Sequence, residues 1–170
     1  LLQNSNKFNI ILTTGGASVG DEDHLISALS KIGKIFFWKA AIKPGRPIAV
    51  GVINKTYVIC LPGNPVSVQL LYAMLISPFI KSLAGGTFKL PSSNKIHCNF
   101  NMRKKTKRME WLRVLKKTIK NKDFAIKYPK QGSGMISSIS YTSGIIEISE
   151  NVSQIKKGDI YDYYNFENIF

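Results

Sequence analysis

The chain has 170 residues, of which 44% are hydrophobic, and its formal net charge is +14 at pH 7. This size and apolar content are enough for one or two small globular domains with buried cores. No basic segment followed by an apolar one opens the chain, and no apolar run approaches the length of a membrane span, so we expect neither a signal peptide nor a transmembrane helix. Because the first residue is Leu1 rather than Met, we expect a piece of a longer protein.

The chain begins with a predicted strand, a loop and a helix. The apolar run 8–12 predicts a buried parallel strand, and acidic residues at 21–23 predict the start of a helix that ends at Gly33. The loop between them offers hydroxyl and glycine N–H groups at a position where α/β proteins bind phosphate, so we favour ligand binding over an ordinary tight turn. Its predicted binding residues are Thr14, Gly15, Gly16, Ser18 and Gly20.

Two carboxylates, Asp21 and Asp23, stand where this loop meets the helix. They could cap the helix and complement its dipole, which is an ordinary structural role. Acidic residues beside a phosphate-binding loop could equally hold Mg²⁺ through a carboxylate and water. Both interpretations stay open on the residues alone.

A second predicted strand, 35–38, leads into a basic loop that ends at Pro47. Three cations, Lys39, Lys43 and Arg46, lie around a Pro-Gly turn in this loop. Isolated surface cations are usually only solvated, but three of them on a loop stiffened by prolines indicate a clamp for an anion.

A β-hairpin is predicted next, from the runs 48–53 and 56–61 with a two-residue turn between them. The second run stops abruptly at a Pro-Gly-Asn-Pro sequence, and an apolar helix follows to about residue 83, in which we expect Pro78 to cause a kink or an early end. A strand that ends just before a helix is typical of anion sites in α/β proteins. The prolines would fix the loop's shape and the other two residues would approach the ligand, so we predict binding by Pro62, Gly63, Asn64 and Pro65.

The pattern changes after Gly85-Gly86. Short β-type runs separated by turn signals recur at 95–102, 110–115, 124–128, 144–149 and 159–164. Such regular short strands predict a compact all-β unit, either a barrel or a sandwich. We therefore place a domain boundary within residues 84–92.

The basic residues are concentrated in this second region, where residues 89–170 carry sixteen Lys or Arg against seven Asp or Glu. The densest run, 103–108, reads Arg-Lys-Lys-Thr-Lys-Arg. Such a face can attract polyanions by counterion release, or it can be a solvated hairpin. No recognition helix, aromatic RNA platform or zinc spacing accompanies the run, so a small, highly anionic ligand explains the charge at least as well as a nucleic acid.

Two places in the second region could contact a ligand. Arg113 lies in a predicted strand on the same face as Trp111, and it is either a binding residue or a surface charge. The loop 131–138, Gln-Gly-Ser-Gly-Met-Ile-Ser-Ser, could wrap around an oxyanion or serve as a flexible connector.

The cysteines and histidines form no catalytic or metal-binding motif. Cys60 and Cys98 have no C-x-x-C spacing, so we expect reduced thiols in a cytoplasmic protein, although two cysteines could also form a disulfide. His24 and His97 share no metal-binding spacing, and we assign neither a role.

Three of these motifs, in this order and spacing, resemble the molybdopterin molybdenumtransferase family, which includes the E domain of gephyrin. The motifs are Thr13-Thr14-Gly15-Gly16-x-Ser18-Val19-Gly20-Asp21-x-Asp23, Phe37-Trp38-Lys39-x-x-Ile42-Lys43-Pro44-Gly45-Arg46-Pro47 and Leu61-Pro62-Gly63-Asn64-Pro65-Val66-Ser67. Arg113 and the loop 131–138 match the family's C-terminal domain, so the resemblance covers nearly the whole chain. It departs at residues 141–144, where the family usually has Ala-Asn, and the family's N-terminal region has no counterpart here.

The resemblance implies an α/β unit followed by a small all-β barrel. Residues 1–88 would be the later half of a molybdopterin-binding domain, with a mainly parallel sheet and flanking helices, and residues 89–170 would be the C-terminal β-barrel. The family inserts molybdate into adenylylated molybdopterin and releases AMP, with Mg²⁺ assisting. The implied catalytic residues are Lys39, Lys43 and Asp23, the metal ligands are Asp21 and Asp23, and the substrate-binding residues are Thr14, Gly15, Gly16, Ser18, Gly20, Arg46, Pro62, Gly63, Asn64, Pro65, Arg113 and Ser133.

The alternative is a non-catalytic binding or scaffolding module on the same fold, as gephyrin uses for receptor loops. We expect small anionic substrates as partners, a homodimer in the full-length protein, and neither specific nucleic-acid binding nor a membrane span. Because the family's first half is unmatched, we expect the isolated chain to have an incomplete active site.

Overall fold

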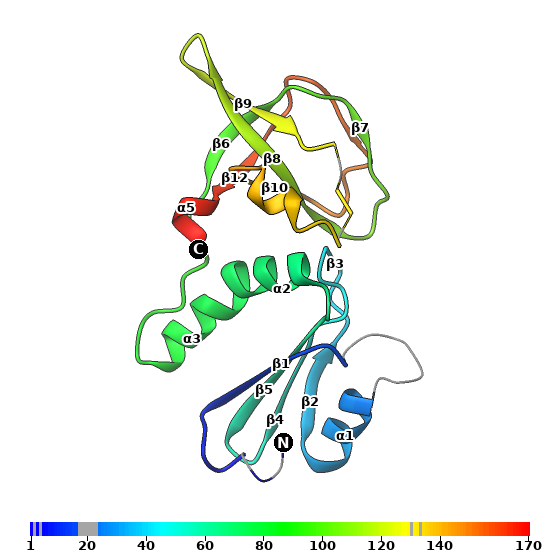
Figure 1. Ribbon diagram of the computed structural model, residues 1–170, viewed down its shortest axis with the longest axis vertical. Coiled ribbons are helices and arrows are strands. Elements are labelled where there is room, and N and C mark those ends of the chain that lie inside the picture. The colour runs from blue at the N-terminus through cyan, green and yellow to red at the C-terminus, as the bar shows by residue number, and fades with distance from the viewer. Residues whose placement is uncertain (2, 4, 17–23, 130, 133) are drawn as a thin grey trace.

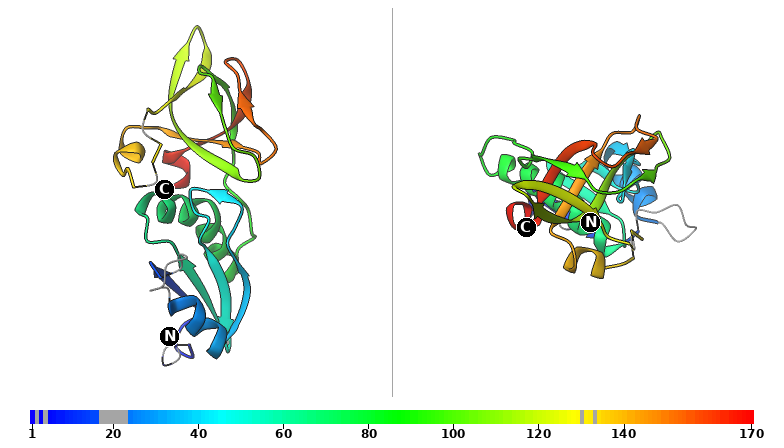
Figure 2. Two further views of the ribbon diagram at one scale, coloured as in Figure 1. Left: turned by 90° about the vertical axis from the view of Figure 1, so that its right-hand side faces the viewer. Right: turned by 90° about the horizontal axis from the view of Figure 1, so that it is seen from above.

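The computed structural model describes residues 1, 3, 5–16, 24–129, 131, 132 and 134–170. Its α/β part lies at one end of an elongated molecule and its barrel at the other (Figures 1 and 2). The α/β part contains β1 (Ile10–Thr14), α1 (His24–Ile32), β2 (Lys34–Trp38), β3 (Ile42–Lys43), β4 (Ala49–Ile53), β5 (Thr56–Leu61), α2 (Pro65–Leu71), the π-helical turn η2 (Tyr72–Ile76) and α3 (Ser77–Leu83). The predicted order of an α/β unit followed by an all-β barrel is confirmed.

The α/β sheet has the strand order β1-β5-β4-β2. β1 and β5 are parallel, whereas β4 pairs antiparallel with both β5 and β2. The prediction of a mainly parallel sheet is therefore wrong for the described strands. The reason is local: Asn54, with φ +54°, allows the two-residue turn that makes β4 and β5 a hairpin.

Both faces of β5 are covered, which explains its continuous apolar run. Val58 and Cys60 pack with Leu29 of α1 on one face, while Ile59 and Leu61 belong to the cluster under α2 on the other. This division follows from the alternation of side chains along a strand.

The long helix continues through Pro78 rather than ending there. The π-helical turn precedes the proline, and the N–H of Ser77 donates to the carbonyl of Tyr72, five residues back. A π-helical turn of this kind shifts the hydrogen-bond pattern just where the proline supplies no donor.

The span Pro65–Leu83 is 19 residues long and apolar enough, by length and composition alone, to cross a membrane. The expectation that no apolar run approaches such a length is therefore corrected. Leu70, Leu71 and Met74 of this span are buried in the largest hydrophobic cluster, as they would be in the core helix of a globular domain.

The second part is a closed barrel. It contains β6 (Asn94–Cys98), β7 (Met102–Arg103), β8 (Met109–Ile119), β9 (Lys122–Lys127), α4 (Ser137–Ser140), β10 (Gly144–Ile148), β11 (Gln154–Ile155), β12 (Ile160–Asn165) and α5 (Phe166–Ile169). The order β10-β12-β6-β9-β8 closes because β8 also pairs with β10. β7 and β11 form a separate two-stranded ribbon.

The two parts are joined by a strand pair and by a shared core. β3, from the basic loop, adds to the barrel sheet in parallel with β8, so that Lys43 faces Glu110 in register. Trp111 and Ile145 of the barrel belong to the same hydrophobic cluster as Leu71 of α2. This junction holds the basic loop against the barrel, and the cleft described next lies there.

Candidate functional site

A cavity of about 650 Å³ lies where the two parts meet. Its α/β wall is formed by residues 42–47 and 62–64 with Ser67, and its barrel wall by Arg108, Glu110, Arg113, Gln131 and Gly132. Of the residues that the structure describes, four cations (Lys43, Arg46, Arg108 and Arg113) and one carboxylate (Glu110) line it. We call this cavity the cleft.

The loop after β5 forms one edge of the cleft. Asn64 caps α2, because its Oδ1 accepts a hydrogen bond of 3.2 Å from the Ser67 N–H. Pro65 occupies the first turn of the helix and does not line the cleft, whereas Pro62, Gly63 and Asn64 do. The Asn64 side chain therefore has a structural partner as well as a place at the cleft.

The glycine loop after β1 lies beside this edge. Thr14 pairs in register with Leu61, and the Gly15 N–H donates to the Leu61 carbonyl at 3.1 Å. A Cβ on Gly63 would be 3.5 Å from the Cα of Gly15. Thr14, Gly15 and Gly16 therefore border the loop 62–64 without lining the cleft itself.

Several predicted residues lie outside the described part of the chain: Ser18, Gly20, Asp21, Asp23 and Ser133. Both predicted Mg²⁺ ligands are among them. Within the described residues, no group of three or more His, Cys, Asp or Glu side chains is arranged to hold a metal ion.

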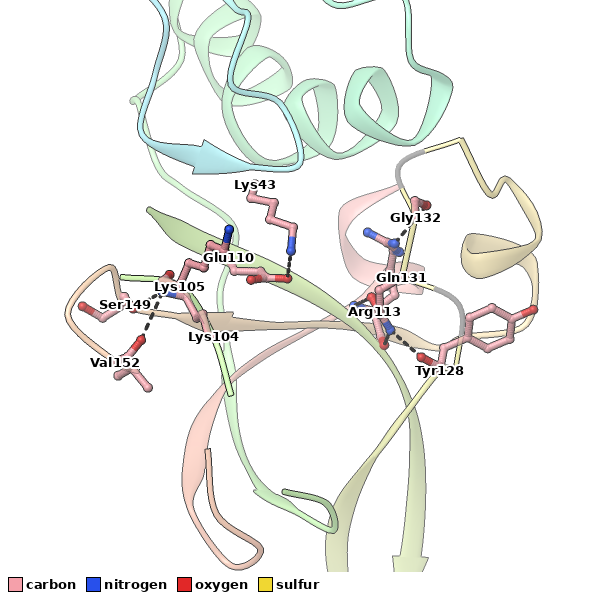
Figure 3. Close-up of polar contacts among 10 residues, drawn as sticks. All are labelled: Lys43, Lys104, Lys105, Glu110, Arg113, Tyr128, Gln131, Gly132, Ser149 and Val152. Atoms are coloured by element: carbon pink, nitrogen blue, oxygen red, sulfur yellow. Dashed lines mark hydrogen bonds and ion pairs between the residues drawn. The ribbon is translucent and has the colours of Figure 1, made fainter. Parts of the chain in front are cut away.

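Lys43 reaches from the basic loop to the barrel. Its Nζ donates to Glu110 Oε1 at 2.9 Å (Figure 3), and the Glu110 side chain is only 9% exposed, compared with 51% for Lys43. The loop has little freedom, because Gly45 has φ +115° and a Cβ there would lie 2.9 Å from Leu71 Cγ. The position of Lys43 at the cleft is thus set by strand pairing, an ion pair and close packing.

The other two cations of the predicted clamp behave differently from each other. Arg46 lines the cleft, and its carbonyl accepts a hydrogen bond from the Ala40 N–H at 3.0 Å, which closes the loop. Lys39 does not line the cleft; its Nζ lies 3.9 Å from the centre of the Trp38 ring, in a cation–π contact. Its predicted catalytic role stays a prediction.

Arg113 is the most deeply buried cation of the cleft, with 2% of its surface exposed. This excludes the alternative of a surface charge. Its Nη2 donates to the Gly132 carbonyl at 3.3 Å, whereas its Nε has no hydrogen-bond partner among the described residues (Figure 3). Burial lowers the pKa of the Arg113 guanidinium, and the nearby Glu110 carboxylate opposes this shift, but a guanidinium stays charged in a protein.

Gln131 ties the loop 131–132 to the strand that carries Arg113. Its Oε1 accepts from the Arg113 N–H at 3.2 Å, and its Nε2 donates to the carbonyls of Arg113 and Tyr128, both at 2.8 Å. Gln131 thereby holds Gly132 at the cleft, next to the guanidinium.

The polar residues Ser67, Arg108 and Glu110 also line the cleft, and none of them was predicted as a site residue. Gln131 and Gly132 belong to the loop that was singled out for Ser133, and Arg108 ends the basic run. The role of Glu110 could not be predicted from the residues around it, because its partner Lys43 is 67 residues away in the sequence.

Comparison with known proteins identifies both parts of the chain. Residues 1–82 match the family described as "probable molybdopterin binding domain", and residues 95–166 match "MoeA C-terminal region (domain IV)". A molybdopterin molybdenumtransferase of Haemophilus influenzae is 37% identical over 106 residues, which cover 62% of this chain and 26% of that protein. A putative molybdopterin biosynthesis protein of Methanocaldococcus jannaschii is 31% identical over 154 residues, covering 91% of this chain and 35% of that protein.

The fold agrees with these sequence matches. The crystal structure of the molybdopterin biosynthesis MoeA protein of Pyrococcus horikoshii superposes with a TM-score of 0.73 and 25% identity, over 95% of this chain and 38% of that one. The chain thus spans between about a quarter and two fifths of the length of these relatives. With both domains matched in the same order as in its relatives, the chain belongs to the molybdopterin molybdenumtransferase family.

Proposed function

We propose that the cleft binds adenylylated molybdopterin and molybdate, and that the chain takes part in inserting molybdate with release of AMP. A role in molybdenum cofactor biosynthesis is what the chain shares with its relatives. The observation that carries the finer proposal is the buried guanidinium of Arg113, whose Nε has no hydrogen-bond partner among the described residues. A buried charged group with an unpartnered donor is costly, and an oxyanion in the cleft would give that donor an acceptor.

The side chains of the cleft have different proposed roles, which follow from their chemistry. Arg113 and Arg46 would offset the charge of molybdate and of the phosphate groups, because guanidinium groups suit tetrahedral oxyanions. Pro62 and Gly63 would shape the edge against which the pterin lies. These tasks are binding and orientation, which place the reacting groups together and stabilise developing charge.

Lys43 has a more specific task in this proposal. Its Nζ is already paired with Glu110 at 2.9 Å, so it is held in place before any ligand arrives. An ammonium group has three donors, so Lys43 can keep this partner and still donate to a second acceptor in the cleft. We assign to it the positioning of the leaving phosphate or of molybdate.

The metal remains a prediction. Mg²⁺ held by Asp21 and Asp23 would neutralise phosphate charge, and Thr14, Gly15, Gly16, Ser18 and Gly20 would cradle the phosphates beside it. A catalytic role for Lys39, binding by Pro65 and Ser133, a homodimer and a cytoplasmic location are likewise parts of the proposal.

The test uses the protein as its gene encodes it, with adenylylated molybdopterin, Mg²⁺ and molybdate, and measures the release of AMP. Lys43→Ala should slow AMP release strongly, whereas Lys117→Ala, which removes an exposed lysine from the barrel outside the cleft, should not. If the folded protein releases no AMP, the proposed reaction is wrong. If both variants react at the wild-type rate, the role of Lys43 is wrong.

A further inference from the structure

A second cavity, of about 280 Å³, lies beside the cleft. The two cavities share Lys43, Arg108, Glu110 and Gln131 as lining residues, so they are contiguous. The remaining wall of the second cavity comes from the barrel: Met102, Arg103, Lys104, Lys105, Leu112, Lys127 and Pro129. We call it the side cavity. It contains the first half of the basic run, to which the proposed function assigns no task.

The basic run is an ordered wall rather than a solvated hairpin tip. Arg103 is in β7 and pairs with Gln154 of β11. Lys104 is only 8% exposed, and its Nζ donates to the carbonyls of Ser149 at 2.9 Å and of Val152 at 3.3 Å (Figure 3). The alternation along this extended segment leaves Arg103 and Lys105, on either side of the buried Lys104, exposed.

The charge of the side cavity is strongly unbalanced. Among the described residues, six cations line it, namely Lys43, Arg103, Lys104, Lys105, Arg108 and Lys127, and Glu110 is the one carboxylate. This carboxylate is already paired with Lys43. Arg103, Lys105, Arg108 and Lys127 make no ion pair within the part of the chain that the structure describes. Burial lowers the pKa of Lys104, as expected for an ammonium group in this position.

Cations gathered around a concave surface repel one another and focus a positive potential, so an anion that enters the cavity is stabilised. We propose that the side cavity is a second anion subsite, which binds one tetrahedral oxyanion or phosphate group next to the ligand in the cleft. The group is either a free inorganic oxyanion or a phosphate of the ligand that occupies the cleft. The proposal rests on the proposed function only if the group is a phosphate of the ligand in the cleft.

The size of the side cavity supports a small ligand. Its volume of about 280 Å³ is at the lower end of the range of roughly 300–1,000 Å³ that is usual for ligand sites, and it has room for a phosphate group. A nucleic acid would instead be bound along an extended basic surface, with strong dependence on salt. The cavity therefore favours the small anion over the polynucleotide.

The experiment is a titration of the isotopically labelled chain with inorganic phosphate, followed by NMR of the backbone amides. Met102 and Lys105 report on the side cavity, and Gly63 and Gly132 report on the cleft. We expect saturable shifts at Met102 and Lys105. In the variant Arg103→Ala/Lys105→Ala, the affinity measured at Met102 should fall by about tenfold or more, which is the size of one charge-assisted contact, while the affinity at Gly63 changes by less than about twofold.

A charge-matched control separates a site from general attraction. Lys117→Ala/Lys122→Ala removes two exposed cations of β8 and β9 that line neither cavity. It should leave the affinity at Met102 within about twofold of wild type, since two charges at a distance are screened by salt. Arg103→Gln/Lys105→Gln, which keeps polar side chains of similar length, takes the place of the alanine variant if that variant does not fold.

A second titration, with AMP in place of phosphate, distinguishes the two sources. Shifts at both Met102 and Gly63 with one common affinity would mean that a ligand phosphate reaches the side cavity. Shifts at Met102 that appear with inorganic phosphate but not with AMP would mean that the side cavity binds a free oxyanion. The proposal is wrong if phosphate moves no amide of the side cavity, if the control variant loses as much affinity as the alanine variant, or if only a DNA oligonucleotide binds there. Because this readout needs no turnover, it can fail while AMP release succeeds, and the reverse.

Discussion

Replacing Arg113 by methionine separates a binding role from a structural one. The substitution puts an unbranched, apolar side chain in the place of an arginine that is only 2% exposed. It removes the charge, the hydrogen bond to Gly132 and the Nε that has no partner among the described residues. If the guanidinium serves an anion, its removal should harm binding and spare the fold.

The magnitudes can be worked out from the contacts. The hydrogen bond from Nη2 to Gly132, at 3.3 Å, has a charged donor and contributes about 1.5–3 kcal/mol to stability. Removing a buried charge relieves a desolvation penalty of several kcal/mol in its ligand-free state, which offsets that loss. We therefore expect the free energy of unfolding of Arg113→Met to be within about 1 kcal/mol of wild type, or higher. A lost charge-assisted contact of about 1.5–3 kcal/mol should weaken anion binding by roughly 10- to 150-fold.

Two measurements on the same samples check this. Urea unfolding followed by circular dichroism gives the free energy of unfolding, and calorimetric titration with molybdate gives the affinity. Arg113→Lys, which keeps the charge and loses the planar group, should lie between wild type and methionine in affinity. A loss of more than about 3 kcal/mol of stability with an unchanged molybdate affinity would refute the reasoning, because a buried network and not a binding group would then explain the arginine.

Three further predictions concern the loop, the ion pair and a buried thiol. Glu110→Gln should raise the phosphate affinity of the cleft several-fold by removing its carboxylate and freeing Lys43, and a fall in that titration would contradict the assignment. Gly45→Ala should lower the free energy of unfolding in urea by about 1–3 kcal/mol, because its Cβ would meet Leu71 Cγ at 2.9 Å. Gly158→Ala is the control: at φ +96° with nothing within 4 Å, it should lose only the stability that backbone strain costs, with no added clash. Burial, with a contribution from Asp159, raises the pKa of Cys98 from 9.0 to about 12, so above pH 9 the unfolded chain loses a proton that the native one keeps. The free energy of unfolding of wild type should therefore fall relative to that of Cys98→Ala between pH 9 and 12. Urea unfolding of the two proteins that gives the same difference in free energy at pH 8 and at pH 10 would disprove this.

The local elements could be read from the sequence because they depend on neighbours along the chain. The hairpin turn at Asn54, the strand that stops before Pro62, and the helix that begins at Pro65 are at or near their predicted places. The recurring β runs of the second region likewise became strands of the barrel. Each depends on residue types with restricted backbone angles or on a simple hydrophobic period.

What the sequence misjudged or left open depends mostly on contacts between distant segments. The mainly parallel sheet was implied by the family resemblance, and the pairing of β4 with β2, in addition to the local hairpin of β4 and β5, made the sheet mixed. For Arg113 the sequence left a binding residue and a surface charge both open, and only the closed barrel packed against α2 made it a buried cation. For the basic run an anion-attracting face and a solvated hairpin were both open, and the pairing with β11 and the burial of Lys104 make it the wall of a cavity.

The sequence by itself determined the family, the order of the two parts and the loops at which a ligand is expected, because motifs and hydrophobic periods are properties of the chain alone. The tertiary structure decided which cations face one another. β3 joins the barrel beside β8, and this places Lys43 next to Glu110 and leaves Lys39 on Trp38. A cation's role depends on the groups that surround it, and those groups come from segments that only folding brings together.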